Sequence, residues 1–146
     1  MKIPHKKTVI IIAGPTAVGK TGVAIEMAQH FKTEIISADS RQCFNELNIG
    51  VARPSKEDLR KIKHHFIATH SILEEVTAAV FEKYALNKVN ELFEKHDLVI
   101  MTGGTGLYLK AFCEGLDEVP VVNTEIRNVI VTNYNNGGIE WLRIRK

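Results

Sequence analysis

Eight residues decide the fold of this chain: Gly14-Pro15-Thr16-Ala17-Val18-Gly19-Lys20-Thr21, which match the pattern G-x-x-x-x-G-K-[ST] at every fixed position. The run before them, residues 8–13, is rich in β-branched residues and predicts a buried strand. Residues 20–31 predict a helix. Strand, glycine loop and helix in this order are the context in which the pattern forms a phosphate-binding loop, or P-loop.

The chemistry of this loop predicts a ligand that contains a diphosphate. Glycines let successive N–H groups point into one concavity, and the start of the helix adds free N–H groups and a positive dipole end. Lys20 can reach the outer phosphate oxygens, and the Thr21 hydroxyl is placed to bind a Mg²⁺ ion shared with them. Kinases, nucleotide hydrolases and some transferases share the loop, so the reaction is left open by this motif.

Composition predicts one ordinary domain, residues 1–146, with 45% hydrophobic and 25% charged residues. The net charge of +2 neither requires nor excludes a nucleic-acid partner. Cys43 and Cys113 lie far apart without metal-ligand spacing, which predicts reduced thiols, no disulfide partner and a cytoplasmic location. No apolar stretch approaches the roughly 20 residues that span a bilayer, so we expect no membrane association.

Strands and helices are expected to alternate along the chain. Strands are predicted at residues 8–13, 34–38 and 97–102, with a shorter one at 65–68. Helices are predicted at residues 20–31, from Ser55, from Thr77, from Leu107 and at residues 124–135. This alternation predicts an α/β fold, a P-loop NTPase-like parallel sheet flanked by helices.

Two details of this pattern carry further expectations. In the helix after Thr77, the predicted buried face consists of Val80, Tyr84, Val89, Leu92 and Phe93. Residues 135–138 are a clear break, and a new amphipathic segment begins at residue 139. Because three firm strands are few for a doubly wound sheet, we expect the chain to be the amino-terminal portion of a longer protein.

A second motif, Ser37-Ala38-Asp39-Ser40-Arg41-Gln42, follows the predicted strand at residues 34–38. Ligands bind at the carboxyl ends of the strands in an open parallel sheet, so Asp39 is expected at the ligand-binding edge. In a nucleotide hydrolase Asp39 would hold the metal ion. It could also simply cap a turn. The usual position for the hydrolase carboxylate, after residues 98–101, holds Thr102-Gly103-Gly104 instead.

Three more segments complete a resemblance to a known family: Gly50-Val51-Ala52-Arg53-Pro54, His64-His65 and Gly103-Gly104-Thr105-Gly106-Leu107-Tyr108-Leu109. With the two motifs above, the chain resembles the tRNA dimethylallyltransferases, also called tRNA isopentenyltransferases. The resemblance runs from about Val9 to Leu116 and covers about the amino-terminal half of the family's usual length. It implies transfer of a dimethylallyl group from dimethylallyl diphosphate to N6 of an adenosine next to the anticodon in tRNA.

The resemblance also implies roles for individual residues. Asp39 would be the general base, and Thr21 with Mg²⁺ would assist catalysis. The P-loop residues would hold the leaving diphosphate. The residues implied in substrate binding are Thr16, Ser40, Arg41, Gln42, Arg53, Thr105 and Gly106, of which Ser40, Arg41 and Gln42 would shape the adenosine pocket. The family's second half supplies most of the tRNA contacts, so the activity of this chain alone stays open.

Other functions fit parts of the sequence. A small P-loop kinase or NTPase would use ATP, and a free-adenylate prenyltransferase would differ only in its acceptor. A non-catalytic nucleotide- or RNA-binding module would not need Asp39. The basic run that contains Arg53, Lys56, Arg60, Lys61 and Lys63 fits either tRNA phosphates or an ordinary solvated helix face.

Overall fold

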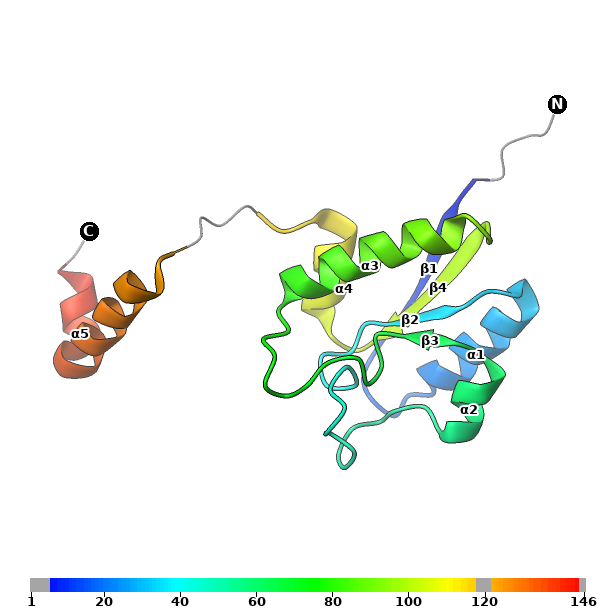
Figure 1. The fold of residues 1–146 in the computed structure, drawn as a ribbon, viewed down its shortest axis with the longest axis horizontal. Helices are drawn as coiled ribbons and strands as arrows, with labels where there is room; N and C mark the ends of the chain where they lie inside the picture. Colours follow the sequence, from blue (N-terminus) through cyan, green and yellow to red (C-terminus); the bar gives the residue numbers. More distant parts are fainter. Residues whose placement is uncertain (1–5, 118–121, 145–146) are drawn as a thin grey trace. The chain divides into compact units, whose positions relative to one another are not determined.

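The structure is a computed structural model that describes residues 6–117 and 122–144. It divides into two compact units, residues 1–116 and residues 117–146, and each is described by itself. The first unit contains the sheet, both sequence motifs and four helices (Figure 1). Residues 145 and 146, which end the segment predicted from residue 139, lie outside the described residues.

The sheet consists of four parallel strands, as the sequence predicts. They are β1 (Thr8–Ala13), β2 (Ile35–Ser37), β3 (His64–His65) and β4 (Leu98–Gly103). Their order across the sheet is β1-β4-β2-β3, and every adjacent pair is parallel. The strand predicted at residues 65–68 was placed too late, because Phe66 and Ala68 have φ values of 61° and 49° and so leave the extended conformation.

Helices cover both faces of the sheet (Figure 1). The helix α1 (Lys20–Phe31) packs Ala24, Ile25 and Ala28 against one face, where Ile35 and Ile100 lie. The helices α3 (Ala78–Phe93) and α4 (Gly106–Glu114) pack against the other face.

Strand alternation explains this division into two core layers. Neighbouring strand residues point to opposite faces, so Ile36 and Met101 contribute to the layer under α3, while Ile35 and Ile100 contribute to the layer under α1. Strands that are buried on both faces have continuous apolar sequences, and this made the strands predictable from the sequence.

The buried face of α3 differs from the predicted one at its amino-terminal end. Phe81 and Ala85 are fully buried, together with Val89 and Leu92, whereas Val80 is 38% exposed. The Phe81 ring stacks on Tyr108 of α4 with ring centroids 4.5 Å apart. The prediction of Val80 was therefore wrong by one position, while Val89 and Leu92 were placed correctly.

Two predicted helix starts are confirmed by their capping bonds. Ser55 Oγ accepts a hydrogen bond from the Asp58 amide at 3.1 Å, at the start of α2 (Lys56–Lys61). Thr77 Oγ1 accepts one from the Val80 amide at 3.3 Å, at the start of α3. Each bond satisfies one of the free N–H groups of a helix end.

The second unit consists of α5 (Thr124–Arg143). Asn123 caps this helix by accepting a hydrogen bond from the Glu125 amide at 2.8 Å. The backbone leaves helical geometry at Gly138, with φ 61° and ψ −160°, so α5 is two helices across a kink. The predicted break at residues 135–138 is therefore confirmed. None of the helices in the described residues has the length and apolar character needed to cross a membrane.

A close backbone approach joins the ends of β4 and β2. Gly103 lies directly against Ala38, and a Cβ atom at Gly103 would be 2.1 Å from the Ala38 carbonyl oxygen. The Ala38 amide also donates a hydrogen bond of 2.7 Å to the Thr102 carbonyl. Only glycine fits here, and this fixes the height of the second motif relative to β4.

Replacing Gly103 by Ala should therefore destabilise the folded chain. We expect Gly103→Ala to lower the free energy of unfolding by about 3 kcal/mol, the upper range for overpacking, because backbone atoms must move. Gly22→Ala is the matched control, since a Cβ there meets nothing within 4 Å and α1 should gain about 0.5–1 kcal/mol. Denaturant titration measures both variants, and equal midpoints would contradict the tight contact.

Glu34, which precedes β2, is partly buried against His65 of the edge strand β3. His65 Nε2 donates a hydrogen bond to Glu34 Oε2 at 2.6 Å, and Lys63 Nζ lies 3.7 Å from the same oxygen. Burial lowers the pKa of His65 below 6.5, although Glu34 opposes this shift. Partial burial acts to raise the pKa of Glu34, but the His65 hydrogen bond and the Lys63 charge outweigh it, so this pKa lies below 4.5.

Stability should therefore fall as the pH decreases. Both groups have lower pKa values in the folded state than in the unfolded state. As the pH falls below 6.5, the unfolded chain therefore binds a proton at His65 more readily than the folded chain does, and the same holds for Glu34 below pH 4.5. Each excess proton gives a slope of at most about 1.4 kcal/mol per pH unit. His65→Gln keeps a donor toward Glu34 but cannot titrate, so we expect a shallower slope between pH 6.5 and 5 in denaturant titrations. An unchanged slope would contradict this assignment.

Candidate functional site

The P-loop connects β1 to α1, in the order that its sequence predicts. Gly19 precedes α1 with φ 92°, a left-handed conformation that other residues rarely adopt. Lys20 is the first residue of α1, and its Nζ atom donates a hydrogen bond to the Pro15 carbonyl. The ammonium group therefore lies over the loop, at the amino-terminal end of the helix.

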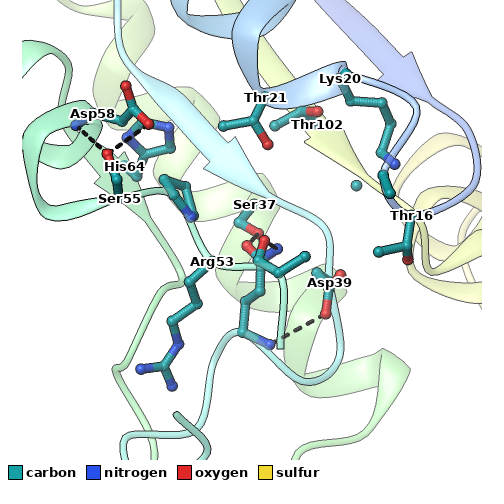
Figure 2. A pocket seen from close by; sticks show the side chains of 16 residues that line it. Thr16, Lys20, Thr21, Ser37, Asp39, Arg53, Ser55, Asp58, His64 and Thr102 are labelled. Carbon is teal, nitrogen blue, oxygen red and sulfur yellow. Dashed lines mark hydrogen bonds between the residues drawn. The ribbon is translucent and has the colours of Figure 1, made fainter. Parts of the chain in front are cut away.

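A cleft of about 460 Å³ lies beside this loop (Figure 2). The P-loop contributes Thr16, Lys20 and Thr21 to one wall, and Asp39 comes from the turn after β2. The segment between β2 and β3 forms the opposite wall. Its lining residues include Arg53, Pro54, Ser55 and Asp58, and His64 of β3 also lines the cleft. We call this the larger cleft.

Asp39 is oriented by its own turn. Its Oδ1 atom accepts hydrogen bonds from the Arg41 amide at 2.9 Å and the Gln42 amide at 3.2 Å. The other carboxylate oxygen, Oδ2, accepts no hydrogen bond from the described part of the chain. One oxygen therefore holds the turn, and the second is available to a ligand.

A smaller cleft of about 280 Å³ adjoins the larger one. Several residues line the smaller cleft and not the larger one, among them Ser40, Arg41, Gly50, Val51 and Thr105. Thr16, Asp39 and Ala52 line both clefts. The carboxylate of Asp39 therefore lies where the two clefts adjoin.

Gln42 joins three parts of these walls. Its Oε1 atom accepts a hydrogen bond from Ser37 Oγ at 3.0 Å, and its Nε2 atom donates one to the Ala52 carbonyl at 2.7 Å. With its backbone amide bound to Asp39, Gln42 connects the end of β2 to the segment that separates the clefts.

The structure brings most of the residues implied by the resemblance to these clefts. The larger cleft includes Thr16, Ala17, Gly19, Lys20, Thr21, Asp39, Gln42 and Arg53, and the smaller one includes Pro15, Ser40, Arg41 and Thr105. Gly14, Val18 and Gly106 are in neither lining.

Arg53 reaches the larger cleft only with part of its side chain. Its guanidinium points away from Lys20 and Thr21 (Figure 2). Nη1 donates a hydrogen bond to Asn48 Oδ1 at 3.2 Å, and Nη2 donates one to the Phe44 carbonyl. Arg53 therefore braces the loop of residues 44–53, and its Nε atom is buried without a partner in the described residues.

Sequence reasoning named Arg53 and the His64-His65 pair but missed Ser55 and Asp58 in the opposite wall of the larger cleft. Ser55 Oγ donates a hydrogen bond to Asp58 Oδ2 at 2.8 Å, which keeps the pKa of Asp58 below its usual value. His64 Nδ1 donates to the Ile62 carbonyl at 2.9 Å, and its Nε2 atom is buried without a partner in the described part of the chain. Burial lowers the pKa of His64, which favours the neutral ring.

One missed residue did carry a sequence signal. Thr102 lines the larger cleft as a polar residue near the carboxyl end of the predicted strand, where ligands bind in parallel sheets. Ser55 and Asp58 had no such signal, because the path of the segment between β2 and β3 places them there. His64 belongs to β3 and to the His64-His65 pair already quoted for the resemblance.

Two of the five basic residues of the run are paired with neighbouring carboxylates. Lys61 Nζ lies 3.0 Å from Glu57 Oε1 and 3.6 Å from Asp58 Oδ1, and Lys63 pairs with Glu34. Lys56 and Arg60 have no ion pair within the described residues. This surface is therefore less positive than the sequence suggests.

The parallel sheet, the loop conformation between β1 and α1, and the cleft beside it define a P-loop α/β protein. Within this class the chain belongs to the IPP transferase family, whose sequence profile matches residues 42–145.

Curated relatives agree with this assignment. The chain is 52% identical over 137 residues to the tRNA dimethylallyltransferase of Flavobacterium johnsoniae, covering 94% of this chain and 44% of the relative. It is 51% identical over 134 residues to that of Christiangramia forsetii, covering 92% and 44%. The chain thus spans less than half the length of these two relatives.

Solved structures show the same fold. The tRNA isopentenylpyrophosphate transferase of Bacillus halodurans matches with a TM-score of 0.74 and 30% identity, over 92% of this chain and 45% of that one. A eukaryotic dimethylallyltransferase acting on tRNA matches with a TM-score of 0.73 and 28% identity, over 90% of this chain and 35% of that one.

Proposed function

We propose that the protein transfers a dimethylallyl group from dimethylallyl diphosphate to N6 of an adenosine next to the anticodon in tRNA. The observation that carries this proposal is that Asp39 lines both clefts, with one carboxylate oxygen unused. A donor bound at the P-loop and an acceptor in the smaller cleft would meet at this carboxylate. The curated relatives named tRNA dimethylallyltransferase support the choice of reaction.

The acceptor needs a base. The lone pair of an exocyclic adenine amine is delocalised into the ring, so the amine is a weak nucleophile. In the proposed step N6 forms a bond to the allylic carbon, the bond from that carbon to the diphosphate oxygen breaks, and the N6 proton passes to Asp39 Oδ2. A positioned base of this kind contributes about 10²- to 10⁴-fold to the rate.

The negative charge of the leaving diphosphate needs to be stabilised. As the carbon–oxygen bond breaks, negative charge develops on the diphosphate. The backbone amides of residues 14–21, the amino-terminal end of α1 and the Lys20 ammonium would stabilise that charge. The same loop that positions a transferred phosphoryl group in kinases would here hold a leaving group, and no nucleoside triphosphate would be consumed.

Mg²⁺ fits the donor set of the larger cleft. The described residues contain no group of three His, Cys, Asp or Glu side chains, but Mg²⁺ commonly keeps several waters and uses few protein ligands alongside phosphate oxygens. Thr21, whose hydroxyl carries the motif's metal-binding role, lines the cleft. When bound, the ion would add positive charge to the departing diphosphate.

The acceptor side is proposed to be the smaller cleft. Ser40 and Arg41 line it beside Thr16 and Thr105, so a flat base could lie against backbone and hydroxyl groups there. Gln42 would help to shape this pocket from behind, through its bond to the Ala52 carbonyl. Two free cysteines are consistent with a reducing compartment, and we place the protein in the cytoplasm, where tRNA is modified.

Binding separates this proposal from an ATP-dependent kinase or NTPase. With Mg²⁺ present, we expect the chain to bind dimethylallyl diphosphate more tightly than ATP in calorimetric titration. Lys20→Ala should weaken binding at least tenfold, because it removes the ammonium group over the loop. Lys83→Ala, on the exposed side of α3, is the matched control and should bind as the unmodified chain does. A clear preference for ATP would contradict the proposal.

The base is tested by an isosteric change. Asp39→Asn keeps an oxygen that accepts from the Arg41 and Gln42 amides, so the turn should persist. It removes the proton acceptor, and we expect kcat for prenyl transfer to a tRNA anticodon stem-loop to fall about 10²- to 10⁴-fold in the full-length protein. Affinity for dimethylallyl diphosphate should stay within about twofold. Unchanged turnover would remove Asp39 from the mechanism.

A further inference from the structure

The turn after β4 contacts the backbone on both sides of Asp39. The Ala38 amide donates to the Thr102 carbonyl at 2.7 Å, and the Ala38 carbonyl accepts from the Thr105 amide at 3.2 Å. The Ser40 amide donates to Thr105 Oγ1 at 2.9 Å. Asp39 is therefore held between two residues that are both bound to the segment of residues 102–105.

Thr105 uses its hydroxyl in an unusual way for its position. It is the N-cap residue of α4, where a threonine hydroxyl commonly accepts a hydrogen bond from an amide of the first helical turn. Thr105 makes no such bond. Its Oγ1 atom instead accepts from the Ser40 amide and donates to Ser40 Oγ at 3.3 Å.

These bonds differ from those that Asp39 makes itself. The hydrogen bonds from the Arg41 and Gln42 amides to Asp39 are local, so they move with the turn and do not fix it in the molecule. Thr105 lies 65 residues further along the chain than Ser40 and belongs to the segment that joins β4 to α4. It is thus an anchor from outside the turn.

We propose that Thr105 is a positioning residue that acts through Ser40 and fixes Asp39 where the two clefts adjoin. This inference rests on the proposed function, in which Asp39 is the base. Its physical basis is that a reacting group displaced by about 1 Å can lose about 10²-fold in rate. Loss of the Thr105 hydroxyl would also leave the Ser40 amide without its partner.

The test uses two substitutions of nearly equal shape. Thr105→Val removes the hydroxyl and keeps the branched side chain, whereas Thr105→Ser keeps the hydroxyl. In the full-length protein we expect Thr105→Val to lower kcat for prenyl transfer about 10- to 100-fold, with KM for dimethylallyl diphosphate within about twofold. Thr105→Ser should return kcat to within about threefold of the unmodified protein.

Hydrogen exchange gives a readout that does not depend on activity. The Ser40 amide should exchange at least tenfold faster in Thr105→Val and normally in Thr105→Ser, because only the first loses the acceptor. Thr33→Val is the matched control. Thr33 is buried, and its hydroxyl donates to the Leu98 carbonyl at the other end of β4, so its loss should lower stability without changing kcat or Ser40 exchange.

The outcomes separate the inference from the function on which it rests. An active protein in which Thr105→Val has normal kcat would overturn the positioning role. A fall in kcat with unchanged Ser40 exchange would also overturn it, because Thr105 would then act on the substrate directly. An unmodified full-length protein that transfers no prenyl group would remove the proposed function, and this inference with it.

Discussion

The pairing of β4 with both β1 and β2 is the constraint on which the rest of the structure depends. The P-loop follows β1 and the Asp39 turn follows β2, so both begin at the same edge of the sheet. Adjacent strands are about 4.8 Å apart, so the two strand ends that carry these segments are separated by roughly 10 Å. A single strand between them therefore sets the width of the larger cleft, and the close contact of Gly103 with Ala38 sets the relative height of its walls.

The sequence was informative wherever a local rule decides the conformation. Apolar runs predicted β1, β2 and β4, and the spacing of strand, glycine loop and helix predicted the order of β1, the P-loop and α1. It failed where neighbouring residues were equally apolar: Val80 and Phe81 both suit a buried position, and packing against Phe66 and Tyr108 decides for Phe81.

Ser55 and Asp58, in the wall of the larger cleft opposite the P-loop, were not predictable for a different reason. The path of the segment between β2 and β3 is held by hydrogen bonds between residues nine and ten positions apart, such as those from Arg53 to the Phe44 carbonyl and from Gln42 to the Ala52 carbonyl. No pattern in the sequence predicts such bonds. They help to place Ser55 and Asp58 opposite the P-loop, and the Arg53 guanidinium points away from it, whereas His64 is placed by the pairing of β3 with β2.

The strand order also has a consequence for biosynthesis. In the sheet β1 contacts β4 and does not pair with β2, although β2 follows it by only about two dozen residues of chain. During synthesis from the amino terminus, β1 and the P-loop have no partner strand until residues 98–103 have left the ribosome. The edge hydrogen-bonding groups of β1 therefore stay unpaired over most of the translation of this unit, even when α1 covers one face of the strand, which makes the nascent chain a candidate for chaperone protection.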